Sequence, residues 1–179
     1  RAVGIASDDQ GLIPAALDDQ LQAFRASGEL ERVKAVYLVP YFDNPRGISM
    51  PSERVEAVVD AAQRWSQRQR IYVVADEAYR ELRYSGAEVP SALSADPAGE
   101  TVIAAGTFSK SFSPGIRVGW GILPTCLIEP ICDIKGNIDF GSPNLNQMLM
   151  CRVLAEGSFE RHVAAIRRWF ISGSSDAMM

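Results

Sequence analysis

Lys110 has a sequence setting that could make its amine a nucleophile. It follows an apolar run at 101–105 that ends where polar residues begin. Hydroxyl-bearing residues surround it in the sequence: Thr107, Ser109, Ser111 and Ser113. A lysine near a protein interior has a depressed pKa, and a neutral amine can form a Schiff base with an aldehyde. Spacing alone leaves open a surface lysine in a serine-rich loop.

The same stretch does not encode a nucleotide-binding P-loop. That motif, GxxxxGK[ST], would need glycine at positions 104 and 109 if Lys110 and Ser111 were its last two residues. The chain has Ala104 and Ser109 there. Because both glycines are missing, we do not expect a nucleotide at this lysine.

Arg117 follows Lys110 by seven residues, with a Pro114-Gly115 turn between them. A guanidinium at this position could bind a phosphate with two parallel hydrogen bonds, and the hydroxyls of Thr107 and Ser109 could share that phosphate. The alternative is an arginine at a strand end that is paired with a carboxylate.

Asp76 comes directly after a short β-branched run at 71–75. A carboxylate at the end of a buried strand needs a partner, and a protonated ring nitrogen would serve as one. The alternative is an N-cap for a helix that begins at Glu77. Tyr79 lies three residues further on, so on such a helix its hydroxyl would face the same ligand.

Segments with helical and strand patterns alternate along the chain, which predicts an α/β fold. The expected helices cover 14–27, 52–69, 144–154 and 159–171, and the expected strands cover 34–40, 71–75, 101–105 and 117–123. Ligands of parallel sheets bind beyond the carboxyl ends of the strands. The polar residues at 76–79 and 106–110 are therefore the best candidates for a site.

Composition excludes several classes of protein. The 179 residues are 47% hydrophobic and 22% charged, with a net charge of −4, which argues against disorder and against nucleic acid as the main partner. No apolar run approaches the roughly 18 residues that span a bilayer, and the N-terminus lacks the pattern of a signal peptide. Three widely spaced cysteines indicate reduced thiols in a cytoplasmic protein.

The chain offers little for metal or histidine chemistry. His162 is the only histidine, and no CxxC pair exists, so we expect no metal site. His162 lies in a charged helical stretch, and we expect it to be a solvated surface residue.

Taken together, the motifs resemble one family. Asn44-Pro45-x-Gly47, then Asp76-x-x-Tyr79, then Ser109-Lys110 with Arg117, resembles the fold-type I pyridoxal-phosphate (PLP) enzymes and is similar to the class I/II aminotransferases. Read alone, Asn-Pro-x-Gly is only a turn signal. The segment 106–119 is the strongest part of the resemblance, and 141–147 is similar to the branch that contains the aminoadipate and kynurenine aminotransferases.

The resemblance implies roles for these residues. Lys110 would form a Schiff base with PLP and then act as general base and acid. Asp76 would bind the pyridine N–H and keep the ring protonated. Asn44 and Tyr79 would hydrogen-bond the 3-oxygen of the ring.

The phosphate of PLP would be held by Thr107, Ser109 and Arg117. One position departs from the family pattern: Arg46 stands in the Asn-Pro-x-Gly turn where threonine is usual. Its charge could bear on substrate selection or on a dimer contact.

The family fold is a three-layer αβα domain with a mostly parallel sheet, and we expect this chain to be a central part of it, truncated at both ends. Residues 1–155 would belong to the PLP-binding large domain, and 156–179 would form the helix that leads to the small domain. Missing strands would leave unpaired sheet edges and uncovered apolar surface. We therefore expect the isolated chain to aggregate and to be inactive.

The resemblance implies transfer of an amino group between an amino acid and a 2-oxo acid, by a homodimer whose boundary would include Arg46 and the loop at 142–146. Two alternatives share the same cofactor contacts. One is another PLP enzyme of this fold, such as an aminocyclopropane-carboxylate synthase or a C–S lyase. The other is an aminotransferase-like effector domain of a transcription regulator.

Overall fold

The computed structural model of the chain describes residues 1–176. Its helices are α1 (Pro14–Ala26), α2 (Ser52–Trp65), α3 (Phe108–Ser111), α4 (Thr125–Asp139), α5 (Asn144–Ala155) and α6 (Ser158–Asp176). Its strands are β1 (Ser7–Asp8), β2 (Gly11–Leu12), β3 (Ala35–Leu38), β4 (Tyr72–Asp76), β5 (Val102–Thr107) and β6 (Gly119–Ile122). The alternation of helices and strands confirms the predicted α/β class.

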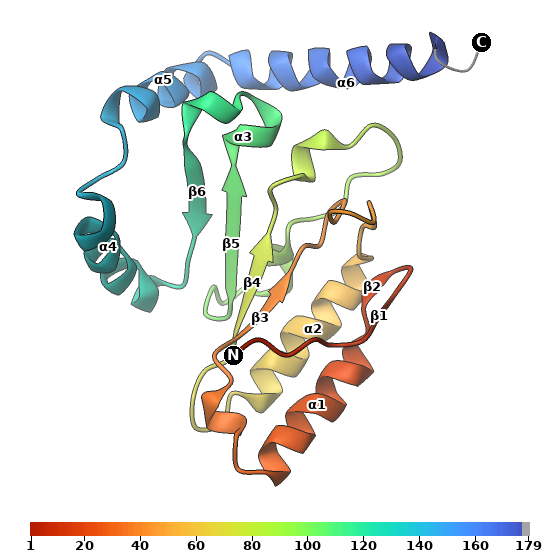
Figure 1. Cartoon of the computed structure of the whole chain (residues 1–179), viewed down its shortest axis with the longest axis vertical. Helices are drawn as coiled ribbons and strands as arrows, with labels where there is room; N and C mark the ends of the chain where they lie inside the picture. The colour runs from red at the N-terminus through yellow and green to blue at the C-terminus, as the bar shows by residue number, and fades with distance from the viewer. Residues whose placement is uncertain (177–179) are drawn as a thin grey trace.

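The main sheet has the order β3-β4-β5-β6, and β1 and β2 form a separate small hairpin (Figure 1). The strands β3, β4 and β5 run parallel, whereas β6 is antiparallel to β5. The mostly parallel sheet is as expected. The register places Asp76 of β4 opposite Ala105 of β5, so β4 and β5 end at the same edge of the sheet.

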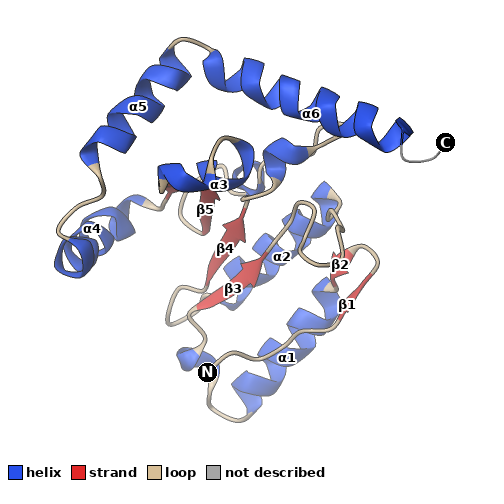
Figure 2. Cartoon of the chain, turned by 45° about the horizontal axis from the view of Figure 1, so that its top comes forward, coloured by secondary structure: helices blue, strands red, loops and turns tan. Residues whose placement is uncertain are grey.

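One face of the sheet is covered by α1 and α2 (Figure 2). Strand residues alternate between the two faces, and those on this face are buried against the apolar sides of the two helices. The resulting core contains Leu17, Leu21, Val36, Leu38, Met50, Val55, Val58, Val59, Ala61, Ala62, Ile71, Val73, Ala75, Ala92 and Val102. The opposite face carries Tyr37, Val74 and Asp76 and is more exposed.

The helices after β6 pack less densely. A small buried cluster of Phe108, Ile116 and Met150 joins α3 to α5. The helix α4 was not among the predicted elements, and none of its residues is buried. Figure 1 shows α4 set apart from the sheet, with α5 and α6 crossing beyond the ends of β5 and β6. Within residues 1–176, no helix is both long and apolar enough to cross a membrane.

The second predicted helix ends earlier than expected, at Trp65 rather than Gln69. Ser66 accounts for the ending, because its hydroxyl donates to the carbonyl of Ala62 (2.7 Å) and accepts from the backbone N–H of Ile71 (2.9 Å). These two hydrogen bonds end the helix, and the chain then continues toward β4.

The alternative that a helix begins at Glu77 is wrong. The backbone N–H of Glu77 donates to the carbonyl of Ala105 (2.7 Å), which extends the ladder between β4 and β5. The chain then turns, and a short 3₁₀ helix, η2, follows at Arg80–Leu82. Tyr79 therefore lies on a turn and not on a helical face shared with Asp76.

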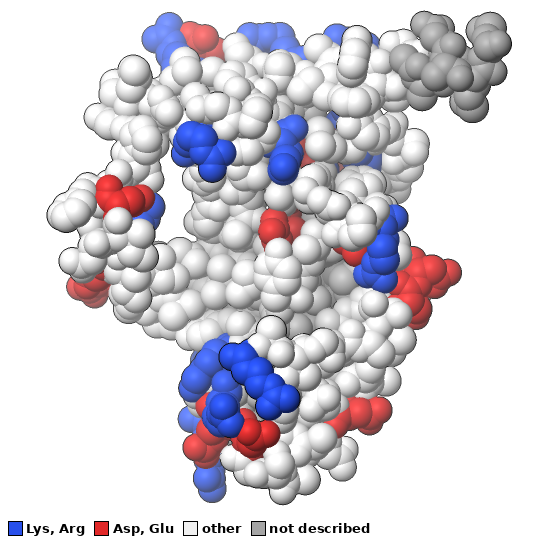
Figure 3. Space-filling view, in the orientation of Figure 1, with Lys and Arg blue, Asp and Glu red and all other residues white. Residues whose placement is uncertain are grey.

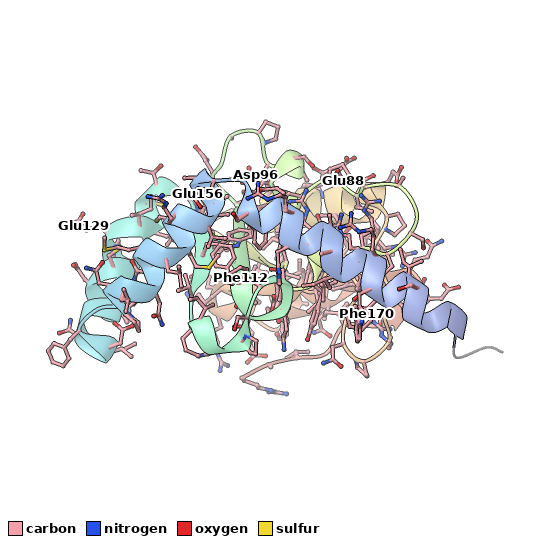
Figure 4. The ribbon with its side chains drawn as sticks, turned by 90° about the horizontal axis from the view of Figure 1, so that it is seen from above. Glu88, Asp96, Phe112, Glu129, Glu156 and Phe170 are labelled. Carbon is pink, nitrogen blue, oxygen red and sulfur yellow. The ribbon has the colours of Figure 1, made fainter. Side chains whose placement is uncertain are left out.

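The expectation that His162 is a solvated surface residue is also wrong. Its ring packs against Phe112 with 5.1 Å between centroids, and its Nε2 atom is buried. Phe159 on the same side of α6 makes an edge contact with Phe108. Seen from above, α5 and α6 lie over the segment that contains Phe112 (Figure 4). His162 lies on the side of α6 that faces Phe112, although its neighbours in the sequence are charged.

Candidate functional site

The candidate residues gather where β4 and β5 end. Asp76 is the last residue of β4, and Lys110 lies three residues after the end of β5, in α3. Tyr79 follows β4 on the turn before η2. Because β4 and β5 are parallel neighbours, their carboxyl ends bring these side chains to one edge of the sheet, as predicted.

The carboxylate of Asp76 is held on both oxygens. The hydroxyl of Tyr37 donates to Oδ2 (2.8 Å), and the backbone N–H of Ala78 donates to Oδ1 (3.1 Å). Tyr37 lies opposite Val74 in the register, so it shares the open face of the sheet with Asp76. The carboxylate is half-buried and has a fixed orientation. It retains lone pairs for a further donor.

Tyr37 is a donor over the whole neutral range. Burial, and then the hydrogen bond and charge of Asp76, raise the pKa of the phenol to about 12. The predicted strand at 34–40 gives no role to this residue in the sequence analysis. The alternation of side chains along a strand could have indicated Tyr37, because it points to the opposite face from its buried neighbours Val36 and Leu38.

Asn44 and Tyr79 come from different loops and meet at the site. The amide Nδ2 of Asn44 donates to the hydroxyl of Tyr79 over 3.5 Å. Asn44 precedes Pro45 through a cis peptide bond. Asp43 organises this loop, because its Oδ1 accepts from the backbone N–H of Ile48 (2.9 Å). The amide and the phenol thus present two polar groups side by side.

Arg46, the residue that departs from the family pattern, is engaged within the chain. Its guanidinium pairs with Asp43 (2.9 Å). Its Nη1 also donates to Ser7 Oγ (3.1 Å) and to the carbonyl of Asp8 (3.3 Å). These contacts tie the turn at 44–47 to β1.

Lys110 lies near Tyr79, with Nζ 5.8 Å from the centroid of the phenol ring. Its side chain is exposed, so of the two settings that the sequence left open the structure shows a surface lysine. The reason is positional: the buried residues of α3 are Phe108 and Ser111, and Lys110 lies on the other side of this short helix.

Arg117 and Ser109 also meet. Arg117 has a left-handed backbone (φ 53°, ψ 36°). Its Nη1 donates to Ser109 Oγ (3.4 Å) and to the carbonyl of Pro114 (3.0 Å). The partners of Arg117 are therefore hydroxyl and carbonyl oxygens, not the carboxylate of the alternative interpretation.

Thr107 has a different role in this structure. Its hydroxyl accepts from the backbone N–H of Ser109 (3.1 Å), which caps α3, and donates to the carbonyl of Val118 (3.5 Å). Thr107 thus fixes the start of the segment that carries Ser109 and Lys110.

The donor set fits PLP in its chemistry. Asp76 offers a fixed acceptor for a ring N–H, while Asn44 and Tyr79 offer polar groups for a ring oxygen. Lys110 offers an amine near them, and Arg117 with Ser109 offers a cation and a hydroxyl for a phosphate.

Two cavities adjoin the site. One of about 650 Å³ lies between β5, β6 and α5 and includes Thr107 and Gln147 in its lining. The other, about 730 Å³, lies beside residues 1–5 and reaches Tyr37 and Arg46. In Figure 3, charged side chains gather toward the lower end, along the upper edge and at the sides of the face, and fewer lie over its middle.

Comparison with known proteins places the chain among aminotransferases and proteins related to them. The family model described as aminotransferase class I and II matches residues 6–173. The aromatic-amino-acid aminotransferase 1 of Thermococcus litoralis is 32% identical over 177 residues, which cover 99% of this chain and 40% of that protein. The HTH-type transcriptional regulator NorG of Staphylococcus aureus is 33% identical over 134 residues, 75% of this chain and 29% of the regulator.

The fold also matches solved structures. The kynurenine aminotransferase of Pyrococcus horikoshii, solved in complex with PMP, superposes with a TM-score of 0.86 at 32% identity, over 93% of this chain and 39% of that one. This likeness confirms a truncated αβα fold and the predicted resemblance to the kynurenine aminotransferase branch. The chain spans about 29% to 40% of the length of these relatives.

Proposed function

Since the chain belongs to the class I and II aminotransferase family, we propose that it is the cofactor-binding part of an enzyme that transfers an amino group from an amino acid to a 2-oxo acid. The cofactor of this family is pyridoxal 5'-phosphate. The observation that carries the proposal is the Asp76 carboxylate, fixed by Tyr37 (2.8 Å) at the sheet edge that also bears Tyr79 and Lys110.

When bound, PLP supplies an aldehyde that condenses with amines and a protonated ring that withdraws electrons. Asp76 would accept the ring N–H and stabilise its positive charge. Tyr37 and the backbone N–H of Ala78 keep that carboxylate aimed in one direction. Asn44 and Tyr79 would bind the ring oxygen from one side.

Lys110 would hold the cofactor in the resting enzyme and, once released by substrate, move a proton at the substrate α-carbon as general base and acid. Its place in α3, next to Tyr79, supports this role. Arg117 and Ser109 would bind the phosphate, and Thr107 would act through its cap on α3.

We also infer the division of the chain. Residues 1–155 would belong to the large domain, and 156–179 would begin the connection to a small domain. The helix α6 fits a connecting element, because it rests on the large domain through Arg167, whose Nε donates to the carbonyl of Glu81 (2.9 Å). Residues 177–179 of this segment lie outside the described part of the chain.

The substrates and assembly follow from the family. Amino acids and 2-oxo acids would be the partners in solution, in a cytoplasmic homodimer. The loop at 142–146 and the turn at Arg46 remain the proposed boundary of that dimer. In this chain Ser142 accepts from Lys135 (2.7 Å) and Arg46 pairs with Asp43.

Reductive labelling tests the role of Lys110. The chain is incubated with PLP, reduced with borohydride, digested and mapped by mass spectrometry. We expect the phosphopyridoxyl group on the peptide containing Lys110, and its loss in Lys110→Ala. The matched control is Lys34→Ala, an exposed lysine at the opposite end of the sheet. Labelling of Lys34 or Lys135 in place of Lys110 would contradict the assignment.

A second function is favoured by the identity with NorG, in which the related segment belongs to a transcription regulator. In such a domain PLP would act as a bound effector. Addition of an amino acid to the PLP-loaded full-length protein separates the possibilities, because the isolated chain is expected to be inactive in either case. Conversion of the bound cofactor to pyridoxamine 5'-phosphate supports transfer. An unchanged cofactor spectrum supports a regulator, and release of an eliminated product without pyridoxamine supports a lyase or aminocyclopropane-carboxylate synthase.

A further inference from the structure

We propose that Glu77 is a positioning residue: it anchors the turn that carries Asp76 and Tyr79, and through Arg80 and Tyr41 it ties this turn to the loop that carries Asn44. This inference rests on the proposed function, because it concerns how the PLP-binding groups are held in place.

Glu77 and Asp76 point to opposite faces of the sheet. Successive residues of an extended chain alternate, and the ladder with β5 continues through the backbone N–H of Glu77. Asp76 therefore lies on the open face, while Glu77 is 4% exposed and enters the core side. Consecutive Cα atoms are only about 3.8 Å apart, so whatever fixes Glu77 also limits the movement of Asp76.

The carboxylate of Glu77 is bound to a distant segment. Its Oε1 accepts from Ser91 Oγ (2.6 Å) and from the backbone N–H of Ala92 (3.1 Å). Ala92 begins the 3₁₀ helix η3 (Ala92–Ala95) and is 1% exposed, as part of the main core. The turn after β4 is thereby fastened to the best-packed part of the chain.

Arg80 connects Glu77 to Tyr41. Its Nη1 is 3.9 Å from Glu77 Oε2, and its guanidinium carbon is 5.8 Å from the centroid of the Tyr41 ring. Glu77 Oε2 and Arg80 Nε are both buried, with no hydrogen-bond partner within residues 1–176. Because a buried charge is costly without compensation, Glu77 Oε2 depends on the guanidinium of Arg80. Arg80 Nη2 also pairs with the exposed Glu88, at 3.5 Å.

Tyr41 completes the link to the second loop. It is 2% exposed, its hydroxyl donates to the carbonyl of Pro90, and it precedes Asn44 by three residues. The contact between Asn44 and Tyr79 is long, at 3.5 Å, so it cannot by itself hold the two loops in register. We infer that the contacts among Glu77, Arg80 and Tyr41 hold the two loops in position relative to each other.

Two pairs of variants test the proposal: Glu77→Ala with Glu77→Gln, and Asp96→Ala with Asp96→Asn. Asp96 is a matched control, because it is also a buried carboxylate (3% exposed). It accepts from the backbone N–H groups of Thr101 (2.7 Å) and Val102 (2.8 Å), at the end of β5 away from the site. Both pairs of variants remove a buried structural carboxylate. Only the Glu77 variants remove one that lies next to the proposed PLP-binding groups.

The first readout is PLP binding, by the dissociation constant and by the absorbance and circular dichroism of the bound cofactor. We expect Glu77→Ala to raise the dissociation constant roughly 10- to 100-fold, by analogy with the loss found when the hydrogen-bond partners of metal ligands are removed. The dichroism band should also weaken. Glu77→Gln keeps an acceptor for Ser91 and Ala92 and should lie between wild type and Glu77→Ala. The Asp96 variants should bind PLP as wild type does.

The second readout needs no cofactor. Hydrogen exchange of the peptide 77–82 should accelerate in Glu77→Ala and not in Asp96→Ala. Equal effects of the two truncations on both readouts would overturn the proposal, as would slow exchange in Glu77→Ala. If Glu77→Ala does not fold, the same comparison is made with Glu77→Gln and Asp96→Asn. If wild type binds no PLP, the proposed function fails, and the exchange measurement still decides whether Glu77 anchors the turn.

Discussion

The chain has two regions that use apolar residues differently. The region up to β5 buries them: Leu21 is 1% exposed, and Val58 of α2 is 0% exposed. The region after β5 leaves many of them on the surface, with Ile138 of α4 76% exposed and Phe140 97% exposed. Both regions have amphipathic helices. Periodicity thus specifies a helix and its apolar face, whereas burial requires a neighbour for that face.

The candidate site lies on the border between these regions. Asp76 ends β4 and Tyr79 follows it, and one face of β4 packs in the main core. Arg117 belongs to the less densely packed region that begins with α3. The groups proposed for the pyridine ring therefore have a rigid support. The groups proposed for the phosphate rest on the small cluster of Phe108, Ile116 and Met150.

The largest difference between the regions should appear in a pair of leucine truncations. Leu21→Ala in α1 should lower the free energy of unfolding by about 2–5 kcal/mol, because it leaves a cavity in a packed core. Leu145→Ala in α5, where the side chain is 78% exposed, should change it by less than about 0.5 kcal/mol. Urea denaturation followed by circular dichroism measures both. Comparable losses in the two variants would show that the second region is as well packed as the first.

Exposed apolar residues of α4 should also make the isolated chain self-associate. Replacing Ile134 or Ile138 by lysine removes apolar surface, so it should raise several-fold the protein concentration at which light scattering begins. The matched control for each single replacement is Asn137→Lys, since it adds the same one unit of positive charge to α4 without removing an apolar side chain. An equal gain from Asn137→Lys would mean that net charge, and not the apolar face, controls association.

Tyr37 lies in the well-packed region, where its side chain is 61% exposed and yet has a fixed partner, Asp76. Partial desolvation of the phenol, and then the hydrogen bond and charge of Asp76, raise its pKa to about 12. A raised pKa in the folded state means that this contact contributes its full stability below pH 10 or so and loses it as the pH rises through about 12.

Absorbance of ionised phenols measures that titration. We expect wild type to show a phenol that ionises near pH 12, and Tyr37→Phe to lack it. Asp76→Asn should shift the midpoint downward only in part, since partial desolvation of the phenol is the largest cause and remains. A midpoint unmoved by Asp76→Asn would show that the contact between Tyr37 and Asp76 does not form in solution.

Local residue patterns were sufficient for the α/β class, the order of the strands along the chain and the candidate residues at the ends of β4 and β5. The reason is that strand periodicity, turn residues and polar strand exits are properties of short segments. The exposed position of Lys110, which the sequence left open as one of two alternatives, and the turn at Tyr79 were not settled in this way. They depend on how α3 and the continued ladder at Glu77 pack against the rest of the chain.

The remaining features were decided by contacts between distant segments. Tyr37 reaches Asp76 across 39 positions of sequence, Glu77 reaches Ser91 across 14, and His162 turns inward onto Phe112. A single sequence contains both partners of each pair but not their distance, which depends on sheet register and helix packing. The residue types therefore determined which chemistry is possible, and the tertiary structure decided which side chains hold one another in place to perform it.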